Sequence, residues 1–159
     1  MEHSTEVGLS FGLTSAIITT TGLMVGLSSA SQSKFVVLGG ILTIAVADAF
    51  SDSLGIHIAE ESENVHSRKQ IWTSTIATFL AKFFFALTFV VAVLFFELQT
   101  AIVVNIVWGL SLLGIFSYRM GKKQGLNPWG VVGEHLLIAV IVIVLTHFVG
   151  DFVHFFLGT

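Results

Sequence analysis

Two aspartates inside a long apolar stretch are the residues of this chain best suited to chemistry. Asp48 and Asp52 are four residues apart, so both carboxylates lie on one face of a helix. A charge at membrane depth costs on the order of 3 kcal/mol, and two adjacent carboxylates repel each other, which favours a proton on one of them. A cation removes both penalties, and carboxylate oxygens suit Mn²⁺, Fe²⁺, Mg²⁺ or Ca²⁺. The pair therefore predicts a divalent metal site.

Lys82, in a later apolar stretch, is the obvious protein partner for an aspartate. A structural ion pair with Lys82 is the alternative interpretation for either carboxylate, although one lysine does not neutralise two. If the pair binds a metal ion, we expect Lys82 to hold an aspartate charged while the ion is absent. Protons would compete with the ion for the same carboxylates, which supplies coupling.

Two further sets of ionisable residues accompany apolar stretches and are candidate metal ligands. They are Glu60, Glu61 and Glu63 after the second stretch, and His147, Asp151 and His154 in the last. The glutamates are either a solvated helix end or a mouth that gathers cations from the cytosol. The second set shares one helix face, and it is either solvated at the interface or an exit site for metal or protons.

The elements that must position these side chains are long apolar runs. The chain has 159 residues, of which 54% are hydrophobic and only 11% are charged, about half the charged share of a soluble domain. A helix needs roughly 20 apolar residues to cross a bilayer, and the runs lack the alternation of barrel strands. We predict an all-α membrane protein, a single transmembrane domain over residues 1–159, with spans near 7–30, 35–59, 71–96, 100–118 and 131–157.

The basic residues predict how these spans are oriented. Five of the seven lie in the loops after spans two and four, whereas Lys34 alone follows span one and Lys82 is inside span three. Basic loops remain in the cytoplasm. We therefore expect a cytoplasmic N-terminus, an outside or lumenal C-terminus and a multi-pass protein, in the plasma membrane if the chain is prokaryotic. The acidic start argues against a cleaved signal peptide.

Small residues form a stripe along one face of the first span, where they allow close approach of another helix. The stripe comprises Gly8, Gly12, Ser15, Thr19, Gly22, Gly26 and Ser29. It predicts either packing against another span of the same chain or a seam between subunits of a homodimer, lining the pore.

Composition excludes several classes of function. Net charge is −3 without a basic patch, which argues against nucleic-acid binding. There are no cysteines for thiolate metal sites, and we find no nucleophile–base set or phosphate-binding loop, so we expect neither an enzyme nor a permanently bound cofactor. The six histidines leave a haem or electron-transfer module as an alternative. A structural or regulatory partner descended from a transporter is another.

The first two spans resemble the vacuolar iron transporter family. Residues 12–23 (GLTSAIITTTGL) are similar to its first-helix signature, and residues 47–55 (ADAFSDSLG) with 60–63 (EESE) are similar to its second. This resemblance implies five spans, a dimer with the path between protomers, and proton-coupled export of Fe²⁺ or Mn²⁺ from the cytosol.

The chain departs from the family pattern at positions that carry ligands. Ser15 stands where the family has an aspartate, Asp52 where it has a methionine and Ile56 where it has a glutamate. The link of residues 60–70 is too short for the cytosolic metal-binding domain of plant members. The resemblance therefore implies a small, divergent member, in which we expect Asp48 and Asp52 to offset the missing acid at Ser15.

Overall fold

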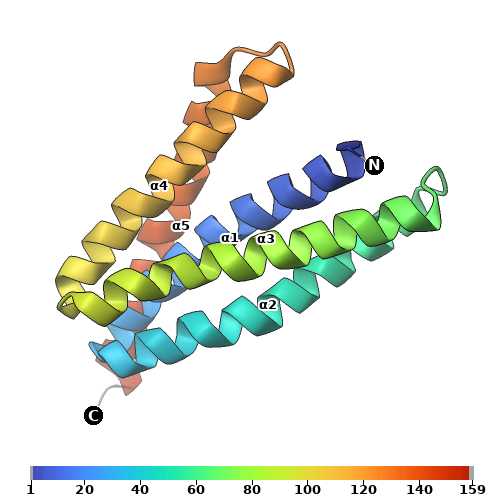
Figure 1. Ribbon diagram of the computed structural model, residues 1–159. Helices are drawn as coiled ribbons and strands as arrows, with labels where there is room; N and C mark the ends of the chain where they lie inside the picture. Colours follow the sequence, from blue (N-terminus) through green and yellow to red (C-terminus); the bar gives the residue numbers. More distant parts are fainter. Residues whose placement is uncertain (1, 158–159) are drawn as a thin grey trace.

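The computed structural model describes residues 2–157, and all regular structure in this range is α-helical. Each of the five helices is long and apolar enough to cross a membrane, which confirms the predicted five-span helical fold. They are α1 (Glu2–Ser31), α2 (Lys34–Ser62), α3 (Arg68–Phe95), α4 (Leu98–Lys123) and α5 (Pro128–Leu157) (Figure 1).

The helices extend beyond the predicted spans at most of their ends. They contain 26 to 30 residues, which at 1.5 Å per residue is about 39–45 Å. The hydrocarbon core is only about 30 Å thick. Hydropathy reports the apolar part alone, so the polar first turn of α1, from Glu2, and the basic last turn of α4, to Lys123, fall outside the predicted bounds.

Short turns connect the helices, and serine side chains cap the helices that follow two of them. Ser33 caps α2, its side chain accepting a hydrogen bond from the backbone N–H of Val36. Ser67 and Gln70 form a reciprocal capping box at the start of α3. Pro128 occupies the first position of α5, where its missing N–H leaves no helix bond unmade. Such short turns make consecutive helices antiparallel neighbours.

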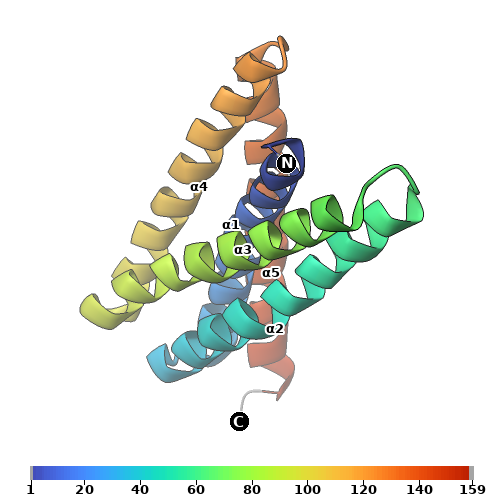
Figure 2. The same cartoon turned by 45° about the vertical axis from the view of Figure 1, so that its right-hand side comes forward.

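Helix α1 lies between two helical hairpins. It contacts α2, α3, α4 and α5, whereas α2 packs on α3 and α5 packs on α4. The α2–α3 and α4–α5 hairpins diverge from each other, and their loops lie at the end of the molecule that also holds the start of α1 (Figures 1 and 2). The end of α5 and the other two turns lie at the opposite end. This is the arrangement that five alternating crossings require.

The core is apolar where α1, α3 and α4 meet. Ile17, Met24, Phe89 and Leu113 are fully buried there. The buried amide of Asn105 donates to the Phe89 carbonyl oxygen at 2.9 Å, which satisfies a polar group that would otherwise be costly at this depth. Large apolar side chains on the outer faces of α2 and α5 are exposed, as expected for helices that face hydrocarbon.

The glycine stripe on α1 contacts two other helices of the same chain. A Cβ at Gly12 would lie 2.6 Å from the Thr78 carbonyl oxygen of α3, and Gly8 meets α3 at Ser74 in the same way. Further along, a Cβ at Gly22 or Gly26 would meet Val142 or Thr146 of α5. The stripe therefore lets the α1 backbone lie close to both hairpins. An interface between subunits along this stripe remains a prediction.

We predict that Gly12→Ala destabilises the protein by about 1–3 kcal/mol, because the added methyl must displace α3 backbone. The measurement is the thermal unfolding midpoint in detergent. Gly39→Ala is the matched control, since a Cβ there meets nothing within 4 Å. Equal midpoints for the two variants would contradict the close packing of α1 on α3.

Candidate functional site

A buried ion cluster lies where α1, α2 and α3 meet. Lys82 of α3 is 1% exposed and is the largest fully buried side chain among the described residues. Its Nζ lies 2.6 Å from the Asp48 Oδ2 of α2 and also pairs with the Asp52 Oδ2. The aspartate side chains are 30% and 20% exposed, respectively. The single lysine therefore contacts both predicted metal-binding carboxylates.

Ser15 of α1 completes the cluster. Its hydroxyl donates to Asp52 Oδ2 at 2.6 Å and accepts from Lys82 Nζ at 2.7 Å. The three N–H donors of an ammonium group thus match three acceptors, Asp48, Asp52 and Ser15. The hydroxyl group of Ser15 is therefore part of the site.

The cluster has one formal positive charge against two negative charges when all three groups are ionised. Burying an ion pair is favourable only when the geometry satisfies its hydrogen bonds, and Lys82 meets that condition. The excess negative charge remains, and one additional proton or a cation would cancel it. Hydrogen bonds therefore hold the side chains of the cluster in place, and the excess negative charge can be cancelled by either a proton or a cation.

The three predicted glutamates at the end of α2 are not equivalent. Glu60 is only 7% exposed, and its Oε2 accepts from the Ser74 hydroxyl of α3 at 2.5 Å. Glu61 and Glu63 are exposed, and Glu63 lies 3.1 Å from the imidazole of His66. Glu60 therefore faces the helix bundle, while its two neighbours face outward.

The predicted set in α5 meets the end of α1. The His147 Nδ1 lies 2.5 Å from the Ser29 hydroxyl, and its Nε2 lies 3.4 Å from the Asp151 carboxylate. His154 instead bonds through Nδ1 to the Ala30 carbonyl oxygen at 3.1 Å. The three residues share one face of α5, but only two of them contact each other.

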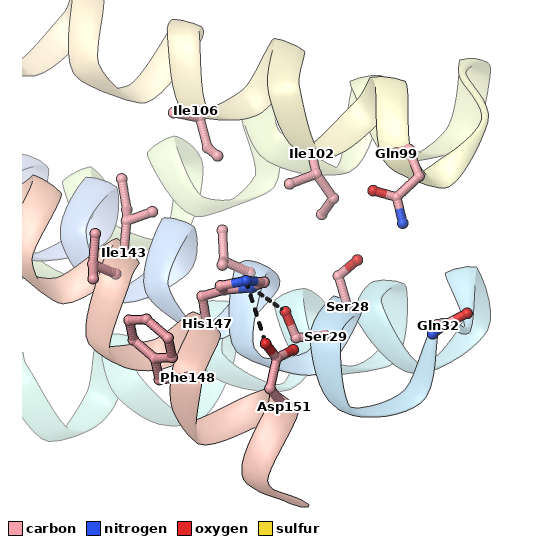
Figure 3. A pocket seen from close by; sticks show the side chains of 12 residues that line it. Ser28, Ser29, Gln32, Gln99, Ile102, Ile106, Ile143, His147, Phe148 and Asp151 are labelled. Atoms are coloured by element: carbon pink, nitrogen blue, oxygen red, sulfur yellow. Dashed lines mark hydrogen bonds and ion pairs between the residues drawn. The ribbon is translucent and has the colours of Figure 1, made fainter. Parts of the chain in front are cut away.

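Ser29, His147 and Asp151, but not His154, border a groove of about 560 Å³ between α1, α4 and α5. In Figure 3 dashed lines join the imidazole of His147 to Ser29 and to Asp151, and Gln99 of α4 lies across the groove. The contact order serine–histidine–aspartate is that of hydrolytic triads. However, Ser29 lies within a helix, where the backbone N–H groups are already bonded and offer no oxyanion hole. The arrangement can exchange a proton or contribute to holding a cation.

Within residues 2–157, no three His, Asp or Glu side chains form a group able to hold a metal ion by themselves. The eight predicted ligands lie in three separate places along the bundle. These places are the Lys82 cluster, the end of α2 and the face of α5 beside the groove. The Asp48–Asp52 pair is the closest approach of two acids to one point, because both touch the same ammonium group.

Sequence reasoning missed the pairing of Glu60 with Ser74 and the contact of Ser29 with His147. Serine in a membrane helix commonly bonds to its own backbone, and Ser74 also donates to the Ile71 carbonyl oxygen. The one available signal for the Glu60–Ser74 contact was the position of Ser74, which lies eight residues before Lys82 on the same face of α3.

Comparison with protein-family models and with curated proteins finds no match to the chain.

We predict that Lys82→Met destabilises the protein by about 3 kcal/mol, because it leaves two carboxylates facing each other without a cation. Replacing the aspartates as well, in Lys82→Met with Asp48→Asn and Asp52→Asn, should restore most of the stability. Thermal unfolding in detergent measures both. A triple variant less stable than the single one would show that the carboxylates do not depend on Lys82 for charge balance.

Proposed function

We propose that the protein is a proton-coupled transporter of divalent metal ions, with Asp48 and Asp52 as the binding pair. The observation that supports this most is the buried Lys82 ammonium held by two carboxylates. A structural pair needs one acid per lysine. The second acid adds a charge penalty at membrane depth, which a function that exchanges cations explains.

Charge balance gives a mechanism for coupling. A dication that binds both aspartates places two positive charges beside the Lys82 ammonium. Protons compete with the dication for the same two carboxylates, and this competition couples the two movements. Binding of the metal ion excludes the proton, and binding of a proton displaces the metal ion. Ser15 supplies a hydroxyl oxygen to whichever cation is present.

The ligands favour a hard or borderline cargo. Two carboxylates and a hydroxyl, without sulfur, suit Mn²⁺ or Fe²⁺ rather than Cu⁺. The resemblance of the first two helices to the vacuolar iron transporter family supports the same cargo and export from the cytosol. Membership of that family, and a homodimer with its path along the α1 stripe, are parts of this proposal.

Glu61 and Glu63 would gather ions at the cytoplasmic mouth, where both are exposed. His147 and Asp151 would bind the ion, or the proton, at the outer groove, and His154 would extend that face. The ion would meet each set of ligands at a different depth along its path, so no single site needs many acidic ligands.

Transport is tested in proteoliposomes that contain a metal-sensitive dye. We expect the variant with Asp48→Asn and Asp52→Asn to lose about tenfold or more of the initial Mn²⁺ uptake rate, since the metal loses its charged ligands. Glu97→Gln should retain the wild-type rate, because Glu97 is exposed and makes no capping bond.

Equal uptake by the aspartate variant and the wild type would reject the binding pair. Uptake by the wild type no faster than by empty liposomes, for Mn²⁺ and Fe²⁺ alike, would reject transport and favour a structural role for the cluster.

The proposed orientation has a separate test, because the chain has no native cysteine. An impermeant maleimide applied to intact cells should label Ser31→Cys, at the end of α1, but not Lys122→Cys, near the α4–α5 loop. Both positions are exposed. The reverse labelling pattern would place the N-terminus outside and invert the direction of export.

A further inference from the structure

Two cavities adjoin each other on the α2–α3 hairpin. One has a volume of about 180 Å³ and lies near the loop, and the other has a volume of about 550 Å³ and extends along the two helices away from the loop. His57 and Trp72 line both cavities, and the centroids of their rings lie 4.8 Å apart in an edge-on contact. Within the described part of the chain, only residues of α2 and α3 line these cavities. Together they form one continuous groove, which we call the hairpin groove.

The smaller cavity carries one charge of each sign. Arg68 and Glu61 both line it and both are exposed, and neither has an ion-pair partner among residues 2–157. A guanidinium group binds phosphate through its planar set of N–H donors. A carboxylate accepts hydrogen bonds from an ammonium group. This end of the groove is therefore complementary to a head group that contains both a phosphate and an ammonium group.

His57 supplies a second acceptor for an ammonium group. The Thr75 hydroxyl donates to the Ile71 carbonyl oxygen at 2.6 Å, so its oxygen accepts from the Nδ1–H of His57 at 2.9 Å. The neutral imidazole then keeps its Nε2 as an acceptor. Only an ammonium group that carries N–H bonds can donate to this nitrogen.

The larger cavity is apolar and lies deeper in the bilayer. Phe50 and Leu54 of α2 line it together with Ile76 and Phe79 of α3. The first three of these residues are more than half exposed, at 62%, 58% and 53%. Trp72 lies where indole rings gather at the membrane interface, and Phe79 follows seven residues later, about 10 Å further along α3. The groove thus runs from the level of the head groups into the hydrocarbon.

We propose that the hairpin groove binds one phosphatidylethanolamine molecule from the leaflet on the side of the α2–α3 loop. Arg68 donates to its phosphate, and Glu61 and the His57 Nε2 accept from its ammonium group. One acyl chain lies in the apolar cavity against Leu54 and Ile76. The volume of that cavity is within the range of about 300–1,000 Å³ that is usual for ligand sites. This site is separate from the Lys82 cluster, and it does not depend on the proposed transport function.

The charges of the groove distinguish this lipid from two others of similar size. Phosphatidylcholine has the same net charge, but its trimethylammonium group has no N–H bond to donate to Glu61 or His57. Phosphatidylglycerol carries the phosphate without a cation, so Glu61 would repel it. We therefore expect the ethanolamine head group to bind most tightly of the three.

Native mass spectrometry of the purified protein, with the three lipids bearing identical acyl chains, tests the proposal. Wild type should retain one phosphatidylethanolamine with an apparent affinity about tenfold above that for the other two, as for one charge-assisted hydrogen bond. Glu61→Gln should abolish the preference for ethanolamine over choline. Arg68→Gln should weaken both of these lipids by about tenfold, because both carry the phosphate. Glycerophosphoethanolamine, which has no acyl chains, should not compete.

Matched controls separate the groove from general effects of charge and size. Lys69→Gln removes the neighbouring exposed cation of α3, and Glu134→Gln removes an exposed acid at the same end of the bundle. Neither residue lines the groove, so both variants should retain lipid as wild type does. Ile76→Trp should fill the apolar cavity and lower retention of phosphatidylethanolamine, whereas Ile115→Trp, at an exposed residue of α4, should not.

The thermal unfolding midpoint in detergent gives a second measurement, because a ligand that binds the folded state raises it. Without lipid, Glu61→Gln and Arg68→Gln should unfold at the wild-type midpoint, since both residues are exposed. Added phosphatidylethanolamine should raise the midpoint of wild type more than that of either variant.

Equal retention of the three lipids by wild type and Glu61→Gln would show unselective contact with surrounding lipid and would overturn the inference. Tighter binding of phosphatidylglycerol, or full competition by glycerophosphoethanolamine, would overturn it as well. A wild-type dimer that carries no lipid and that Ile76→Trp dissociates would show that a second copy of the chain covers the groove instead. None of these outcomes bears on Mn²⁺ uptake, so the lipid site and the metal site are tested separately.

Discussion

A lysine ammonium in the middle of a membrane bundle must have acceptors for all of its protons, and this requirement organises the protein. Lys82 is buried from every side and finds its acceptors on two other helices. The interaction is long-range in sequence, since it joins Ser15, Asp52 and Lys82. It therefore fixes the relative depth of α1, α2 and α3, because a slip of one helical turn would leave a bare charge in hydrocarbon.

The close packing of α1 serves the same requirement. Ser15 reaches Lys82 only because Gly8 and Gly12 let the α1 backbone approach α3 directly. Larger residues at these positions would separate the two helices and lengthen the hydroxyl contacts. The hydrogen bonds of the cluster and the small residues of α1 on the N-terminal side of Ser15 therefore depend on each other, because the close packing sets the distance between Ser15 and Lys82.

The sequence predicted the helices well and the side-chain partners only in part. Long apolar runs report membrane spans by themselves, and the spacing of Asp48 and Asp52 placed them on one face. Helix register across the bundle depends on packing, which no local pattern records, so the inward turn of Glu60 toward Ser74 was not predicted. For the same reason, the sequence marked Ser15 only as a position without an expected acid. In the structure its hydroxyl contacts both Asp52 and Lys82.

Helix α1 divides its length between the two hairpins. Its first half packs on α3, and its second half packs on α5 through Gly22 and Gly26 and meets His147 at Ser29. The hairpins have few contacts with each other apart from the α3–α4 turn and its surroundings. If one hairpin rocked against the other, α1 would have to transmit the displacement, because it packs on both hairpins. Ser15 and Ser29 lie about 21 Å apart along α1. A rotation of α1 would therefore move both side chains, which lie at opposite depths of the bilayer.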